Sequence, residues 1–383
     1  MSTLKVDTIT KADGTGSLSV PAETGTVVTT ASPSLGRRNL IINGAMQVAQ
    51  RGTSFTGLTG GQYTLDRFYF NPNILGTWTA SQDTDAPDAF GNSLKLACTT
   101  ANASPSATAY SFSFQKFEGQ NLQQLKKGTS SAESVTVSFW VKSNKTGDIQ
   151  VNLLDNDNSR MVSSVVTINS SATWEHKTAT FVGDTTGAFD NDNAASMSLE
   201  IWYDAGSNFT SGTANTSWAT FNNTNRAAGV TLALGDSTSN YINITGVQLE
   251  VGSVATPFEH RSYGEELALC QRYYQRYETA GTPQNYVVLG SGHNATSSNS
   301  YVVNFFPGGT MRSSPSVSNS SVSNSFRWFA ASTNGLTSTI PNKELISPNS
   351  MSMGNNSQTV TAGQGIVLWM TGTGAYVQYD AEL

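Results

Sequence analysis

Residues that could do catalytic or metal chemistry are few in this chain and do not cluster. None of the three histidines is spaced with Cys, Asp or Glu in the way that metal ligands are: they are His176, His260 and His293. The sequence therefore predicts no metal centre and no cofactor that depends on one.

Three short acidic stretches could hold a hard cation. Residues 155–159 begin like a calcium-binding loop, but Arg160 stands where that loop needs glycine and Val166 where it needs its last glutamate. Residues 190–193 depart from the pattern in the same way, and a third stretch contains Asp83, Asp85 and Asp88. We expect polar loops at all three, with a structural Ca²⁺ as the alternative.

Glycoside hydrolysis would need two carboxylates held at a fixed separation across the sugar bond. Four carboxylates are candidates: Asp66, Glu118, Glu200 and Asp204. The coil repeat of a parallel β-helix is not visible. The sequence therefore predicts a protein that is not an enzyme and keeps a glycan depolymerase as an alternative.

Sugar binding fits the residue types better, because pyranose rings stack on aromatic side chains while amides and carboxylates bind the hydroxyls. Glu200 and Trp202 share the polar side of one alternating strand, and Trp140 lies opposite the apolar set of another. We expect Trp140, Glu200 and Trp202 to contribute to a glycan-binding face. The alternative is that the two tryptophans cover a subunit contact or the second face of a buried strand.

The amino-acid composition restricts the classes of protein to which the chain can belong. Of 383 residues only 13% are charged and 37% are hydrophobic, and the net charge is −6. Ser, Thr, Asn and Gly are abundant where charged residues would be expected. This composition suits strands and turns and disfavours long exposed helices. No stretch combines clustered Lys and Arg with aromatics, and no run is long enough to span a membrane, so we predict neither nucleic-acid binding nor membrane insertion. The first residues also lack the apolar core of a secretion signal.

Residues 37–262 have the densest strand pattern. Residues 134–142 and 197–204 alternate between apolar and polar side chains, so each strand has one apolar face. Gly246 interrupts the alternation of residues 241–251 as a β-bulge does. Such short strands separated by turns predict an antiparallel β-sandwich.

The flanking segments differ from this central one. Residues 1–36 contain short strand-like pieces broken by glycine, which predicts either strands that intertwine between copies or a disordered leader. Residues 263–277 have the pattern of a helix, with glutamates at the start and arginines at the end. Four of its residues have the spacing of a short coiled-coil seam, with packing onto a neighbouring sheet as the alternative: Leu267, Cys270, Tyr274 and Tyr277.

Residues 280–383 return to strands and predict a second, smaller sandwich. If this part binds a ligand, its aromatic residues are the candidates: Tyr286, Tyr301, Trp328 and Trp369. The two cysteines, Cys98 and Cys270, are far apart in sequence, and we expect buried free thiols rather than a disulfide.

Six segments together resemble a module found in phage tail-fibre and tail-tip proteins: residues 39–53, 63–68, 88–96, 137–142, 245–259 and 270–274. Each is weak alone, and the ordered set covers residues 37 to about 277. Residues 4–9 and 16–21 are similar to the leaders of phage fibres. Residues 280–383 resemble no family that we can name.

The resemblance implies that residues 37–262 form a jelly-roll sandwich related to carbohydrate-binding modules. Together with the strand and helix patterns, this predicts an all-β protein with a short intertwined leader (1–36), a helical connector (263–279) and a smaller terminal sandwich (280–383). The resemblance also implies a homotrimeric appendage that docks to other virion proteins through its leader, is made in the host cytoplasm and attaches the particle to a host glycan. A structural virion part without a receptor remains the alternative.

Overall fold

The computed structural model describes residues 9–10, 17–18, 37–279, 286–297, 300–306, 308–330, 333–337, 340, 343–355 and 361–383. The chain divides into two units, residues 1–38 and 39–383. In the first unit the described residues are one antiparallel pair, β1 (Ile9–Thr10) with β2 (Ser17–Leu18). The intertwining predicted for residues 1–36 otherwise lies outside the described residues.

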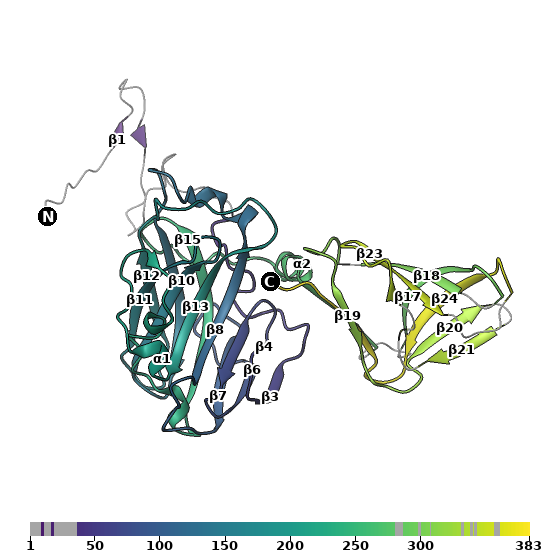
Figure 1. Ribbon diagram of the computed structural model, residues 1–383, viewed down its shortest axis with the longest axis horizontal. Helices are drawn as coiled ribbons and strands as arrows, with labels where there is room; N and C mark the ends of the chain where they lie inside the picture. The colour runs from purple at the N-terminus through teal and green to yellow at the C-terminus, as the bar shows by residue number, and fades with distance from the viewer. Residues whose placement is uncertain are drawn as a thin grey trace, which may run out of the picture. The chain divides into compact units, whose positions relative to one another are not determined.

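The second unit begins with a two-layer antiparallel sandwich, which confirms the predicted all-β class and its jelly-roll-like domain (Figure 1). The β8 sheet consists of β14 (Ala219–Thr220), β11 (Arg160–Ile168), β10 (Gly147–Asp155), β13 (Ala195–Ala205), β8 (Tyr110–Glu118), β5 (Tyr69–Asn73) and β4 (Gln62–Tyr63), in that order. The β9 sheet consists of β12 (Glu175–Phe181), β9 (Val135–Ser143), β15 (Tyr241–Val251), β7 (Ser93–Thr100), β6 (Thr77–Asp83) and β3 (Ser54–Leu58).

The predicted alternation builds the core between these two sheets. Val137 and Phe139 of β9 are buried in it, and so are Leu199 and Ile201 of β13. Gly246 has a φ of 61°, and the register between β15 and β9 shifts between Thr245 and Gln248, which confirms the predicted bulge.

Short helical turns connect these strands. They are η1 (Gly119–Asn121), η2 (Gln123–Leu125), α1 (Ser207–Thr210), η3 (Asn223–Asn225) and η4 (Leu234–Asp236). In the described part of the chain, no helix is long and apolar enough to cross a membrane.

The helix predicted over residues 263–277 is shorter than expected. Helix α2 spans Tyr263–Gln271 and starts with a capping box formed by Ser262 and Glu265. Strand β16 (Tyr274–Glu278) follows, because residues 274–278 pair with residues 376–380 of β25. Since Tyr274 and Tyr277 belong to a strand, the proposed coiled-coil seam does not form.

The C-terminal strands form two sheets around one core. The β25 sheet is β16, β25 (Tyr376–Asp380) and β19 (Ser316–Asn319). The β24 sheet is β21 (Thr333–Thr337), β20 (Phe326–Ala330), β24 (Gly365–Thr371), β17 (Tyr286–Asn294), β18 (Ser300–Phe305), β23 (Ser350–Asn355) and β22 (Lys343–Glu344).

Candidate functional site

A row of aromatic rings crosses the outer face of the β8 sheet. Phe114 of β8 lies opposite Tyr69 of β5, which lies opposite Tyr63 of β4. The rings of Tyr69 and Phe114 are stacked, with centroids 4.6 Å apart and planes at 24°, and Tyr63 contacts Tyr69 edge-on at 5.0 Å. All three rings are partly exposed. We call Tyr63, Tyr69 and Phe114 the aromatic row.

The row continues into a buried cluster. The ring of Trp202 stacks on Phe112 with centroids 4.4 Å apart and planes at 6°. The Arg226 guanidinium lies beside this stacked pair, 4.6 Å from the Trp202 ring centroid and 5.2 Å from the Phe112 ring centroid. Trp202 donates its Nε1–H to Glu200 at 2.7 Å, and Glu200 also forms an ion pair with Arg226.

The segment that carries Arg226 is fixed over the sheet. Asn152 of β10 donates to the carbonyl of Arg226 at 2.8 Å, and Gln150 donates to the carbonyl of Asn225 at 2.8 Å. Trp202 consequently has no exposed surface, and Glu200 is buried beside it. The prediction that these two side chains present a surface for sugar was wrong, because this segment covers them.

Trp140 lies elsewhere. It belongs to β9, on the other sheet of the sandwich, where its partly exposed ring contacts His176 with centroids 5.2 Å apart. Trp140 and Trp202 therefore cannot form one binding face, because the sheets that carry them lie on opposite sides of the core. Alternation indicates which side chains point outward from a strand, but not which sheet the strand joins.

Polar groups surround the exposed part of the aromatic row. Asn71 and Tyr110 are partly exposed beside it, and Lys116 lies two residues beyond Phe114 on the same side of β8. The Lys116 Nζ is 5.5 Å from the Phe114 ring centroid, and within the described residues it makes neither a hydrogen bond nor an ion pair. Burial lowers the pKa of Lys116, and the positive charge of Arg67 lowers it further. The surface thus offers flat apolar rings with an amide, a phenol and an ammonium group nearby.

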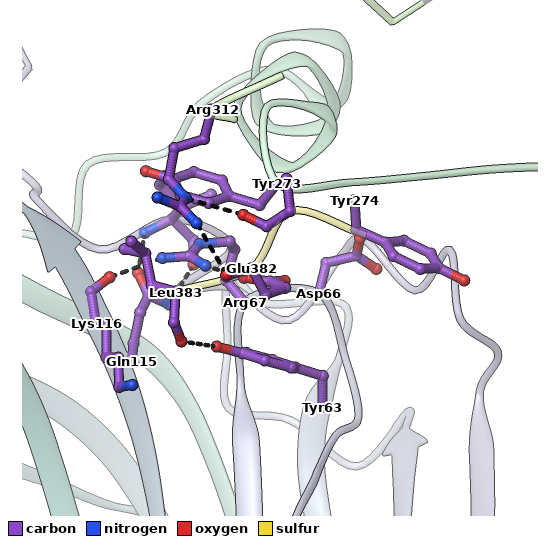
Figure 2. A network of polar contacts seen from close by, with 12 residues as sticks. Tyr63, Asp66, Arg67, Gln115, Lys116, Tyr273, Tyr274, Arg312, Glu382 and Leu383 are labelled. Atoms are coloured by element: carbon purple, nitrogen blue, oxygen red, sulfur yellow. Dashed lines mark hydrogen bonds and ion pairs between the residues drawn. The ribbon is translucent and has the colours of Figure 1, made fainter. Parts of the chain in front are cut away.

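Three of the six segments that carry the family resemblance meet in a different place, at one buried junction. Arg67 forms an ion pair with Glu382, and its guanidinium donates to the carbonyl of Lys116 at 2.7 Å (Figure 2). Gln50 donates to the Asp66 carboxylate and to the carbonyl of Tyr274. These contacts join residues 39–53, 63–68 and 270–274 to the end of the chain, so the resemblance rests on residues that hold the fold together.

The four carboxylates considered for hydrolysis are all buried and already bonded within the chain. Glu118 binds Arg272 and Tyr273, and Glu200 binds Arg226 and Trp202. Asp66 accepts from Gln50, and Asp204 accepts from the backbone N–H of Gly235. Burial raises the pKa of both aspartates.

The acidic stretches lie largely in loops, as expected, although Asp83 and Asp155 are the last residues of strands β6 and β10. Residues 156–159 turn between β10 and β11, and Asp155 forms an ion pair with the buried Lys127 at 2.5 Å. Lys127 also binds Asp184, at 3.1 Å. Among the described residues, no group of three or more His, Cys, Asp or Glu side chains is arranged to hold a metal ion.

The C-terminal candidates divide into buried and exposed residues. Trp328 is completely buried in the core, so the prediction that it lies on a binding surface was wrong. Tyr286 is exposed, Tyr301 and Trp369 are partly exposed, and Tyr286 contacts Trp369 edge-on at 5.8 Å. Sequence reasoning missed Phe329, which stacks on Trp369 at 5.7 Å and 16°. Its position next to the inward-facing Trp328 in β20 is the signal that could have found it.

Comparisons with known proteins give distant likenesses. The enzymatically active domain of tailspike protein 4 from bacteriophage CBA120 is similar over 56% of this chain and 21% of its own, at 13% identity and a TM-score of 0.32. The module TmCBM61, in complex with β-1,4-galactotriose, is similar over 56% of this chain and 100% of its own, at 10% identity and a TM-score of 0.28.

A third likeness is to the CBM22-1 and GH10 modules of Clostridium thermocellum xylanase 10B, complexed with xylohexaose. It covers 57% of this chain and 30% of that one, at 13% identity and a TM-score of 0.28. The chain thus spans about a fifth of the tailspike domain and about a third of the xylanase modules. At such TM-scores these likenesses carry no argument about function. No family model and no curated protein matches the chain.

Proposed function

We propose that this chain is a structural, phage tail-fibre-like protein that attaches a particle to its host by binding a surface glycan on the aromatic row. The observation that carries the proposal is the stacked pair of Tyr69 and Phe114, partly exposed on a sheet face and flanked by Asn71 and Lys116. Sugar rings stack on such aromatic faces, while amide and ammonium groups bind their hydroxyls.

The remaining parts of the proposal come from the resemblance described above. Residues 1–36 would dock to other virion proteins, the chain would be a homotrimer, and it would be made in the host cytoplasm before it acts in the virion. Trp140 and the pair Tyr286 and Trp369 remain further proposed glycan contacts, since each offers a ring surface to solvent.

The proposal is tested on an array of bacterial surface polysaccharides probed with the full chain. We expect at least one polysaccharide to bind, and the double variant Tyr69→Ala and Phe114→Ala to lose about tenfold or more in affinity, which is about 1.4 kcal/mol. Phe90→Ala is the matched control, because Phe90 is also partly exposed and packs on other aromatic rings, Phe258 and His260. Equal binding by the double variant and the control would contradict the proposal.

A purely structural virion part is the second candidate. The specific observation in its favour is that three of the six resembling segments meet at a buried junction rather than on a surface. Failure of the full chain to bind any polysaccharide on the array or any intact bacterial cell would favour this candidate. Release of reducing sugar ends from a bound polysaccharide would instead favour a depolymerase.

A further inference from the structure

One face of the β24 sheet leaves several large apolar side chains uncovered. The other face packs into the C-terminal core through residues such as Trp328, Leu368 and Val302. Six large apolar side chains point away from that core, with these exposed fractions: Tyr286 41%, Val288 64%, Val303 45%, Phe305 73%, Phe329 42% and Leu336 52%. We call these six residues and Trp369 the apolar face.

The register of the strands makes this face continuous. Val288 of β17 lies opposite Trp369 of β24, which lies opposite Arg327 of β20. Arg327 in turn lies opposite Leu336 of β21. The ring of Phe329 stacks on Trp369, and Tyr286 meets the same indole edge-on. On the other side of β17, strand β18 adds Val303 and Phe305.

The size of the apolar face is sufficient for a protein interface. With about 200 Å² for a whole aromatic side chain, the exposed fractions of the six residues leave roughly 500 Å² of surface in contact with water. A standard interface buries about 800 Å² on each partner, of which about 65% is apolar in homodimers. The apolar face alone would therefore provide most of the apolar part of such an interface.

Its chemistry suits another copy of the chain better than a sugar. Val288, Val303, Phe305 and Leu336 offer no group that could bind a hydroxyl, and sugar sites need such groups around the rings. Across strands β20, β24, β17 and β18 the sequence has one Lys, Arg, Asp or Glu, which is Arg327. Two copies meeting on this face would thus bring few like charges together, whereas a partner rich in acidic groups would find one countercharge there.

We propose that the apolar face of the β24 sheet is the surface through which copies of this chain associate. Association removes the exposed side chains of Val288, Val303 and Phe305 from water, and the hydrophobic effect stabilises the assembly. This proposal is independent of glycan binding on the aromatic row of the β8 sheet, and it assigns Tyr286 and Trp369 to the contact between copies instead of to a glycan. It also gives the assembly a contact other than residues 1–36.

Light scattering after size exclusion on the full chain provides the first test. We expect an oligomer whose mean mass falls at least twofold toward the monomer, at equal concentration, in the double variant Val288→Asp and Phe305→Asp. Val254→Asp is the matched control, because Val254 is 73% exposed and lies outside this face, and its mass should equal that of the wild type. A wild-type monomer would overturn the proposal.

Thiol labelling provides a second test that does not depend on how firmly residues 1–36 hold the copies together. The two native cysteines are free and buried, so they contribute little background. In the full-length oligomer we expect Val288→Cys to react with a maleimide at least tenfold more slowly than Val254→Cys. Equal rates at the two positions would overturn the proposal, and so would protection of position 288 that appears only after a polysaccharide is added.

Discussion

The guanidinium of Arg67 lies over the ring of Tyr273, with Cζ 3.5 Å from the ring centroid. Arg67 follows β4 in the sandwich, and Tyr273 lies between helix α2 and strand β16. The Tyr273 hydroxyl donates to Glu118 at the end of β8, so one tyrosine bonds to two parts of the sandwich. Residues 263–278 are therefore joined to the sandwich by polar side chains that bond to one another, with Arg67, Glu118 and Tyr273 buried.

Arg67 should be one of the most sensitive positions for stability. Its side chain is buried and forms an ion pair with the buried Glu382. Arg67→Met keeps much of the volume but leaves the Glu382 carboxylate with Arg51, at 3.4 Å, as its remaining ion-pair partner among the described residues. Breaking a buried pair in this way typically costs about 3–5 kcal/mol. Urea unfolding should show a fall in the free energy of unfolding of this size. Lys126→Met, at an exposed ion pair with Glu133, should change it by less than about 1 kcal/mol.

Stability should decline in acid partly through Glu118. Burial alone would raise the pKa of this carboxyl, but hydrogen bonds from Arg272 and Tyr273 outweigh burial and hold the pKa below the ordinary value of 4.5. Because the folded pKa is the lower one, the unfolded chain takes up this proton first as the pH falls. The stabilisation is complete above about pH 5 and is lost as the pH falls through the folded pKa.

Comparison of Glu118→Gln with the wild type isolates this contribution. The difference in free energy of unfolding should be largest at pH 7 and should shrink between pH 5 and pH 3, as followed by urea unfolding at each pH. Glu133→Gln, at an exposed carboxylate, provides the control. A difference that stays constant with pH would show that the stabilisation from Glu118 does not depend on its charge.

Much of the fold was predictable because alternation is a local signal. The alternation in residues 197–204 correctly predicted that Leu199 and Ile201 face the core and that Glu200 and Trp202 face the opposite side of the strand. The helix was overestimated because tyrosines spaced at 274 and 277 suit a helix as well as a strand. Residues 274–278 form a strand because they pair with residues 376–380, about a hundred residues later in the chain.

The candidate site was less predictable because exposure depends on distant segments. Trp202 is shielded from solvent by the segment that carries Arg226, and no local sequence pattern relates these two residues. The aromatic row depends on the pairing of Tyr69 with Phe114, more than forty residues apart, and neither residue was a candidate. The seven candidates were chosen by residue type, and type alone did not separate the buried Trp328 from the exposed Tyr286.

The two thiols should be unreactive in the folded protein. Cys98 and Cys270 are buried and free, which confirms the expectation from their spacing. Burial raises the pKa of both thiols, so little of the reactive thiolate forms near neutral pH. We expect a thiol-specific chromogenic reagent to detect less than about a tenth of the thiols in native protein at pH 8 and two per chain in guanidinium. Rapid labelling without denaturant would contradict the burial of at least one of them.

The last prediction concerns Trp202, which is buried, and Phe114, which belongs to the aromatic row. Truncation of the first should affect stability most, and truncation of the second should affect glycan binding most. Trp202 is buried against Phe112 and beside Arg226, so Trp202→Ala leaves a cavity and the ion pair of Glu200 without its neighbour. Such truncations typically cost about 3–5 kcal/mol. Phe114→Ala removes a ring that is partly exposed and should cost clearly less in urea unfolding.

Glycan binding should show the opposite order, because the exposed ring contacts ligand and the buried one does not. At a temperature where both variants are folded, Phe114→Ala should weaken binding to an array polysaccharide more than Trp202→Ala does. Trp202→Phe keeps an aromatic ring stacked on Phe112 but loses the hydrogen bond to Glu200, so it should recover part of the stability. If folded Trp202→Ala lost binding as completely as Phe114→Ala, then the segment around Arg226 would have to contact the glycan or hold the aromatic row in place.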